Sequence, residues 1–150
     1  MTLNTVGKFL IVVACVLMNS MAVAKDYSNS DITKVVMLGS GNPFPDPMRC
    51  GPSVAVVVND VPYLFDAAAG IWQATGAATP QYGGSIKALE SNNLAKVFLT
   101  HLHSDHIVGL PSLILLPWAL GRVDPLEVYG PPGTKEMIDN LLEAFREDVG

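Results

Sequence analysis

Short runs of β-branched and apolar residues, each ended by glycine, proline or polar residues, limit the folds open to this chain. Such runs predict strands, which we expect at residues 34–39, 53–58, 63–67, 96–100 and 126–129. The first three runs follow one another closely, which favours an antiparallel meander. The later runs alternate with helical segments. The order predicts an α/β chain of the α+β type, with a mixed sheet and helices packed on one face.

Helical patterns are strongest after residue 100. Residues 107–120 are apolar on most faces, with Pro111 near the first turn and Pro117 placed to kink or end the helix. A second helix is expected to start with Thr134 as its N-cap. Its single apolar stripe predicts an amphipathic helix that covers the sheet, formed by Met137, Ile138, Leu141, Leu142 and Phe145. Between the third and fourth strands, only a short helix over residues 85–90 is expected.

Composition and charge narrow the classes of function. At 150 residues, 49% of them hydrophobic and 15% charged, the chain can form one domain with a real core. The formal net charge is -5, and the lysines and arginines are scattered. A protein that binds nucleic acid electrostatically needs clustered cations. We therefore expect no dedicated nucleic-acid-binding patch.

The first 24 residues predict a signal peptide. The apolar run over residues 9–18 precedes an A-x-A cleavage site that ends at Ala24. This run is shorter than the roughly 20 residues of a membrane-spanning helix. We expect cleavage after Ala24, a periplasmic or secreted product of residues 25–150, and membrane contact only through the signal. The alternatives are a buried first helix, an uncleaved anchor, or lipidation at Cys15.

All three histidines of the chain lie within six residues, together with an aspartate. His101 and His103 follow an apolar strand and would point to one side of it, so they can bind one ion. Asp105 and His106 follow where the chain turns into a helix, and that turn can bring them to a second, adjacent ion. Nitrogen and oxygen ligands without cysteine suit zinc or a similar divalent ion with positions left open for water. Surface histidines, or a structural clip at this turn, are the alternatives.

The segment Thr100-His-Leu-His-Ser-Asp-His106 resembles the H-x-H-x-D-H signature of the metallo-β-lactamase superfamily, an αββα sandwich of metal-dependent hydrolases. Residues 38–45 with Arg49, residues 63–70 and residues 128–133 resemble its ribonuclease Z and arylsulfatase-like branch. The similarity runs from about Lys34 to the C-terminus. The resemblance implies that residues 25–150 are the N-terminal part of such a domain and form half of the sandwich.

This resemblance implies two zinc ions, with manganese or iron not excluded. His101 and His103 would bind the first ion, and Asp105 and His106 the second, with Asp105 also the catalytic proton acceptor. Asp66 would orient the site, although a turn at a strand end explains this residue equally well. Likewise Gly39 and Gly41 would let the backbone pass close to the metal loop, or simply form a turn.

The chain also departs from the superfamily pattern. Members supply a further histidine to each metal and a bridging aspartate from later in the chain, and here no histidine follows His106. We therefore expect weak metal binding and little or no activity from residues 1–150 alone. The first hypothesis is an exported hydrolase that cleaves a phosphodiester or a related sulfate ester with a zinc-activated hydroxide. Export favours a small ester or lactone over a nucleic-acid phosphodiester. The alternative is an inactive fragment or a non-enzymatic remnant that binds a partner through its uncovered sheet face.

Overall fold

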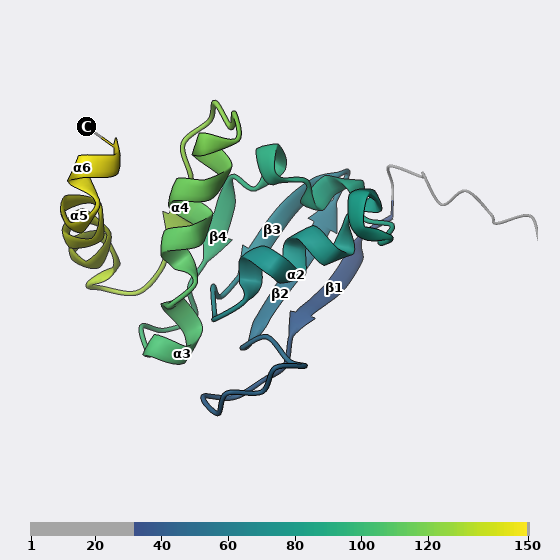
Figure 1. Cartoon of the computed structure of the whole chain (residues 1–150), viewed down its shortest axis with the longest axis horizontal. Helices are drawn as coiled ribbons and strands as arrows, with labels where there is room; N and C mark the ends of the chain where they lie inside the picture. Colours follow the sequence, from purple (N-terminus) through teal and green to yellow (C-terminus); the bar gives the residue numbers. More distant parts are fainter. Residues whose placement is uncertain (1–31, 150) are drawn as a thin grey trace, which may run out of the picture.

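A five-stranded sheet in the order β1-β2-β3-β4-β5 forms the centre of the computed structural model, which describes residues 32–149 (Figure 1). The strands are β1 Lys34–Gly39, β2 Ser53–Val58, β3 Val61–Phe65, β4 Lys96–Phe98 and β5 Glu127–Tyr129. The first three pair antiparallel, while β4 and β5 are added in parallel. The predicted mixed sheet is confirmed. The predicted signal segment lies outside the described residues.

The hairpin between β2 and β3 turns at Asn59 and Asp60, where the sequence predicts a turn. Val58 pairs with Val61 across a two-residue turn, in which Asn59 and Asp60 have φ angles of 50° and 60°. Two left-handed residues are what a type I′ turn requires, and Asn and Asp tolerate that conformation. The third strand was predicted at residues 63–67, which is wrong by two residues at each end.

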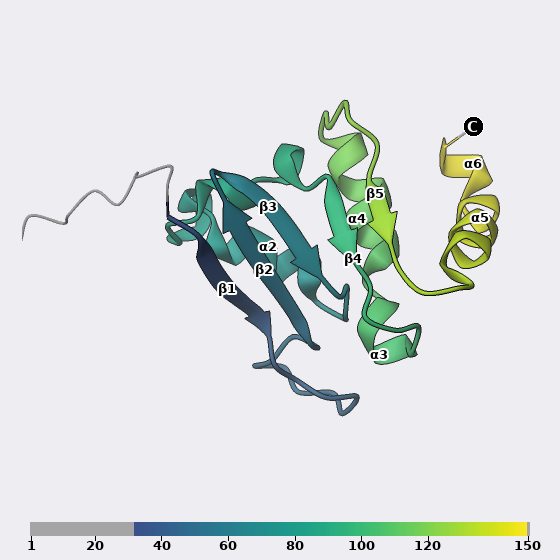
Figure 2. The ribbon, with the colours of Figure 1, turned by 180° about the vertical axis from the view of Figure 1, so that it is seen from behind.

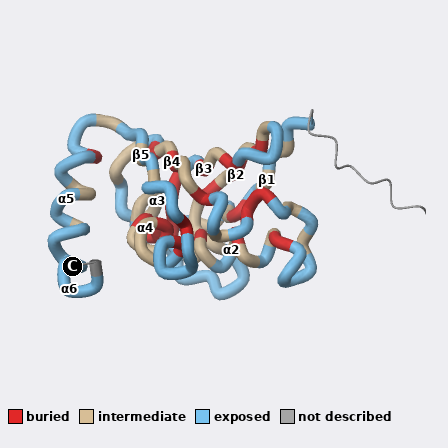
Figure 3. Tube along the Cα trace, turned by 90° about the horizontal axis from the view of Figure 1, so that it is seen from above, coloured by how far each residue is buried: buried red, intermediate tan, exposed pale blue. Residues whose placement is uncertain are grey.

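Two helices, α2 Ile71–Ala78 and α4 Leu110–Ala119, form a layer on one face of the sheet (Figure 3). Inward residues of the strands alternate with outward ones, so β2 is buried at every second position. The core between the two layers is aliphatic and comprises, among others, Ala55, Leu64, Ile71, Val97, Leu110 and Leu113. Within residues 32–149, no helix is both long and apolar enough to cross a membrane.

Among residues 32–149, no helix covers the other face, onto which Figure 2 looks directly. Aromatic rings lie side by side across its centre. The ring of Phe98 lies 5.3 Å from that of Phe65, 4.8 Å from that of Tyr129 and 6.4 Å from that of Tyr63, between centroids. Phe65 and Tyr129 remain 37% and 46% exposed. This aromatic strip is the uncovered sheet face that the sequence predicted.

The segment between β3 and β4 differs from expectation. Helix α2 was not predicted because Gly76 interrupts its pattern, but burial of Ile71 and Thr75 against the sheet compensates for that glycine. The helix predicted over residues 85–90 is only a 3₁₀ turn, η2 Lys87–Leu89. It lies between two similar turns, η1 Pro80–Tyr82 and η3 Ser91–Asn93.

The helix predicted over residues 107–120 is divided in two, α3 Ser104–Ile107 and α4. Pro117 lies inside α4 and does not end it, contrary to one of the predicted outcomes. Because proline has no N–H, it cannot donate to the carbonyl of Leu113, four residues earlier. The Nη1 atom of Arg122 donates to that carbonyl at 2.9 Å and to the carbonyl of Leu94 at 3.0 Å.

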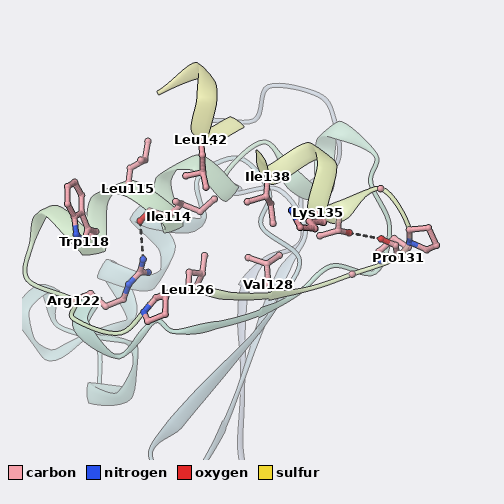
Figure 4. Close-up of a pocket in the computed structure, with 15 residues that line it drawn as sticks. Ile114, Leu115, Trp118, Arg122, Leu126, Val128, Pro131, Lys135, Ile138 and Leu142 are labelled. Carbon is pink, nitrogen blue, oxygen red and sulfur yellow. Dashed lines mark hydrogen bonds between the residues drawn. The ribbon is translucent and has the colours of Figure 1, made fainter. Parts of the chain in front are cut away.

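Arg122 is thus a buried residue, only 6% exposed, whose guanidinium connects backbone carbonyls of α4 and of the segment before β4. Its Nη2 atom also donates to the carbonyl of Ile114 at 3.0 Å, as the dashed line in Figure 4 shows. Burial lowers the pKa of the guanidinium from its usual value. Even so, the group remains a cation because an arginine pKa starts far above neutrality.

Helix α5 Thr134–Ala144 lies beyond the edge strand β5 (Figures 1 and 2). The sequence predicted that it covers the sheet, which is wrong. A groove of about 760 Å³ separates it from α4, and Ile138 and Leu142 line this groove (Figure 4). Its N-cap is Gly133, at φ 97°, and not Thr134, whose hydroxyl donates to the carbonyl of Pro131 at 2.8 Å. A final short helix, α6 Arg146–Val149, follows.

Candidate metal centre

The predicted ligands lie where the chain leaves β4 at the carboxyl end of the strand. β4 ends at Phe98, two residues earlier than expected, and His101 lies in the irregular segment that follows. His103 has extended backbone angles and directly precedes α3. Asp105 and His106 lie within that helix, which begins three residues earlier than the helix expected from Ile107. The change from strand to helix therefore brings all four side chains to one corner of the sheet.

The three imidazole rings and the carboxylate are close neighbours. The ring centroid of His101 lies 4.7 Å from that of His103 and 4.1 Å from that of His106. The Oδ2 atom of Asp105 lies 3.6 Å from Nε2 of His106. His103 is exposed and the other three are partly buried. Solvent thus reaches the cluster from the side of His103.

Asp66 lies behind the cluster and binds it. Its carboxylate, 7% exposed, accepts hydrogen bonds from the backbone N–H of Thr100 at 2.8 Å and from Nδ1 of His106 at 2.8 Å. The residue has a left-handed φ of 59°, which aspartate adopts more readily than most residues. A carboxylate that holds one ring nitrogen of a histidine leaves the other free for a metal. Asp66 thus has the geometry that the resemblance implied.

Backbone hydrogen bonds fix the loop after Asp66 against α3. The N–H of Ala67 donates to the carbonyl of His106 at 2.7 Å, and the N–H of Gly109 donates to the carbonyl of Ala67 at 2.8 Å. A Cβ atom at Gly109 would lie 2.2 Å from the carbonyl oxygen of Ala68, so a side chain there would push these segments apart. Gly109 was not predicted from the sequence, although its position three residues after the cluster was a usable signal.

The glycines near the end of β1 have a more indirect role than the resemblance implied. A Cβ atom at Gly39 would lie 2.0 Å from the carbonyl of Gly51, and one at Gly41 would lie 2.7 Å from that of Cys50. Their close contacts are therefore with the segment that enters β2. That segment in turn meets the loop after Asp66, since the N–H of Gly51 donates to the carbonyl of Ala69 at 2.9 Å.

The chemistry of the donor set is that of a metal site. Imidazole nitrogens and one carboxylate are the ligands that zinc accepts. No three side chains of metal-binding type within residues 32–149 form a group that could hold a single ion. Two pairs, His101 with His103 and Asp105 with His106, would leave coordination positions open on both ions. The described residues alone therefore offer an incomplete coordination shell.

A depression of about 690 Å³ lies beside the cluster, between α3 and the proline-rich loop over residues 42–49. Asp105 lines its inner side. Phe44 and Met48 of the loop are 79% and 88% exposed, and Arg49 adds a cation. Cys50 also lines it, and its thiol donates to the carbonyl of Gly70 at 3.4 Å. Of the four predicted ligands only Asp105 lines this surface, which offers apolar contacts and one positive charge.

Comparison with known proteins identifies the family. Residues 51–146 match the model of the Metallo-beta-lactamase superfamily. The chain belongs to this superfamily. Over 120 residues it is 36% identical to a ribonuclease Z of Mycolicibacterium gilvum, and over 120 residues it is 38% identical to a ribonuclease Z of Mycobacterium marinum. Each alignment covers 78% of this chain, but only 39% and 40% of those proteins. The chain therefore spans about two fifths of the length of the curated relatives it matches.

Solved structures of the superfamily show the same fold. The crystal structure of the short form of human tRNase Z matches with a TM-score of 0.62 at 30% identity, covering 75% of this chain and 40% of the human chain. A metallo-beta-lactamase fold protein of Bacillus subtilis matches with a TM-score of 0.55 at 21% identity, over 72% of this chain and 42% of its own. The predicted family and fold class are confirmed.

Proposed function

We propose that this chain carries metal ligands of a metal-dependent hydrolase that cleaves phosphodiesters. The observation that supports the proposal is the corner formed by His101, His103, Asp105 and His106, with the buried carboxylate of Asp66 behind it. Such a corner is costly to assemble for structural purposes alone, because it places partly buried polar groups at a sheet edge. Its similarity to ribonucleases Z points to ester hydrolysis.

In this proposal His101 and His103 bind one zinc ion, while Asp105 and His106 bind a second; manganese or iron would also suit these ligands. Zinc would supply a water of lowered pKa and a Lewis acid for the ester oxygens. Asp105 would take the proton from the attacking water, because this residue lines the depression where a substrate can lie. Asp66 holds the His106 ring in place.

Two kinds of phosphodiester are candidates. Relatives named ribonuclease Z and tRNase Z direct attention to RNA. The net charge of -5 and the predicted export favour a small phosphodiester, with a sulfate ester as the nearest variant. Phe44 and Arg49 beside Asp105 offer an apolar surface and one cation, which suits an aryl or nucleoside phosphodiester of modest size. We therefore propose a small phosphodiester as the substrate class.

The natural gene product that contains these residues provides the test. With zinc added, it should hydrolyse bis(p-nitrophenyl) phosphate, and Asp105→Ala should lower the rate about 10²–10⁴-fold. The matched control is Asp139→Ala, which removes an exposed carboxylate paired with Lys135 on α5. Equal rates for both variants would contradict the proposal. Parallel assays with precursor tRNA and p-nitrophenyl sulfate would show which ester class is preferred.

Export is part of the same proposal. We infer that the signal over residues 1–24 is removed and that the mature protein is periplasmic or secreted. N-terminal sequencing of the exported fraction should then begin at Lys25. A product that keeps Met1 and stays with the cytoplasmic fraction would contradict export and would favour an intracellular substrate such as RNA.

A further inference from the structure

We propose that Thr100 is a positioning residue that fixes which ring nitrogen His101 presents to a metal. The inference rests on the proposed function, because it concerns how the same corner is prepared to bind an ion. The supporting observation is the position of the Thr100 hydroxyl between two groups. Its Oγ1 atom lies 2.9 Å from both carboxylate oxygens of Asp66 and 2.9 Å from Nδ1 of His101.

Counting protons decides the direction of these hydrogen bonds. An ionised carboxylate only accepts, and a hydroxyl has a single proton to donate. The Thr100 hydroxyl therefore donates to Asp66, and its remaining lone pairs can only accept. A contact of 2.9 Å between Oγ1 and Nδ1 of His101 then requires the proton to be on Nδ1. That tautomer leaves Nε2 of His101 unprotonated, with its lone pair available to a metal.

The same carboxylate sets the tautomer of the second histidine. Oδ2 of Asp66 accepts from Nδ1 of His106 at 2.8 Å, so His106 also presents Nε2. Asp66 acts directly on His106 and, through Thr100, on His101. In the proposed site these two histidines bind different metal ions. One buried carboxylate thus prepares a ligand of each pair, and Thr100 is the connection to the first.

Thr100 is held from two sides, which makes it suitable for this role. Its own N–H donates to Oδ1 of Asp66 at 2.8 Å, so backbone and hydroxyl bind the same carboxylate. The preceding residue, Leu99, is tied to the sheet, because its N–H donates to the carbonyl of Tyr129 at 2.7 Å. A β-branched side chain has few χ1 rotamers. The hydroxyl therefore has little freedom to leave His101.

Two substitutions separate the hydroxyl from the shape of the side chain. Thr100→Val keeps the branched shape and removes the hydroxyl, whereas Thr100→Ser keeps the hydroxyl. The matched control is Thr75→Val in α2, where a buried hydroxyl donates to the carbonyl of Trp72 at 2.9 Å, away from the cluster. Circular dichroism of all variants establishes that they are folded before comparison.

The direct readout is the tautomer of each histidine in the metal-free chain, from two-bond ¹H–¹⁵N correlation spectra at about pH 8, where an ordinary imidazole is neutral. In the wild-type chain, His101 and His106 should both show the Nδ1-protonated form. Thr100→Val should return His101 to the mixed tautomers of a free imidazole and leave His106 unchanged. Zinc affinity, measured by competition with a chromogenic chelator, should fall about 10–100-fold. Thr100→Ser and Thr75→Val should match the wild type in both measurements.

An unchanged His101 spectrum and unchanged zinc affinity in Thr100→Val would overturn the inference. An equal loss of affinity in Thr75→Val would overturn it too, since the effect would then reflect stability and not position. The spectra need neither metal nor substrate, so they are independent of the hydrolase assays. A gene product without hydrolase activity but with the expected spectra would refute the proposed function alone.

Discussion

Arg122 should matter for stability because of a proline five residues earlier. Arg122→Met removes donors from the carbonyls of Leu94, Leu113 and Ile114. A buried polar group left unpaired costs about 1–3 kcal/mol. Within α4, Ile114 keeps a helical donor from residue 118, whereas Leu113 has none because Pro117 lacks an N–H. Losing a buried cation without a carboxylate partner offsets part of this cost. We expect the free energy of unfolding to fall by about 2–4 kcal/mol.

A double-mutant cycle isolates the contribution of Leu113. Pro117→Ala restores an N–H four residues after Leu113, so that its carbonyl regains a helical donor. In that background Arg122→Met should cost about 1–2 kcal/mol less than in the wild type, the value of one buried carbonyl. The cavity left by Pro117→Ala occurs on both arms of the cycle and cancels.

Urea denaturation followed by circular dichroism measures all four free energies. The control is Arg146→Met, which removes an exposed arginine paired with Glu143 and Glu147 and should change stability by less than about 0.5 kcal/mol. If Arg122→Met costs the same with and without Pro117, then the carbonyl of Leu113 does not depend on Arg122. The explanation of how α4 tolerates its proline would then be wrong.

Four further substitutions have defined outcomes. Asp66→Asn should weaken zinc binding about 10–100-fold in a chelator competition; unchanged affinity would show that the carboxylate does not orient the site. Gly109→Ala should lower the free energy of unfolding by about 1–3 kcal/mol in urea denaturation. Gly76→Ala, with no atom nearer than 3.8 Å to the new Cβ, should instead raise it by up to about 1 kcal/mol. A loss of stability in Gly76→Ala and none in Gly109→Ala would refute the packing argument. The Tyr129 hydroxyl and then the Lys96 ammonium lower the pKa of Glu127 below 4.5. The contribution of Glu127 to stability is therefore present above that value and is lost as pH falls through the lowered pKa. Glu127→Gln should accordingly flatten acid denaturation curves, and identical curves would count against the interaction.

The strands were predictable because β-branched runs bounded by turn residues report local preference directly. All five were located, and the two-residue error in the third strand came from hairpin geometry that depends on the left-handed Asn59 and Asp60. Helix α2 was missed for a different reason. Its glycine weakens the local signal, and burial of Ile71, which only the folded sheet provides, compensates.

The four ligand residues could be predicted because they are contiguous, so a single turn brings them together. Asp66 is hydrogen-bonded to Thr100, 34 positions later in the chain, and to His106, 40 positions later. No local sequence pattern encodes such a pairing. The same holds for Arg122, which resembles any scattered basic residue until Pro117 is seen to leave a carbonyl without a donor. Asp66 was therefore suggested only by the family resemblance, and the role of Arg122 was found only in the structure.

The aromatic strip has a border that restricts what can lie on it. Lys96 and Glu127 stand two residues before Phe98 and Tyr129 on the same side of their strands, and their charged groups are 3.1 Å apart. A partner surface that packs on the rings would desolvate this ion pair if it were displaced toward the amino ends of β4 and β5. That desolvation costs free energy. The rings would give a partner apolar contacts, and the ion pair would disfavour its displacement toward the amino ends of the strands. The sheet therefore restricts how a partner surface can be aligned on it.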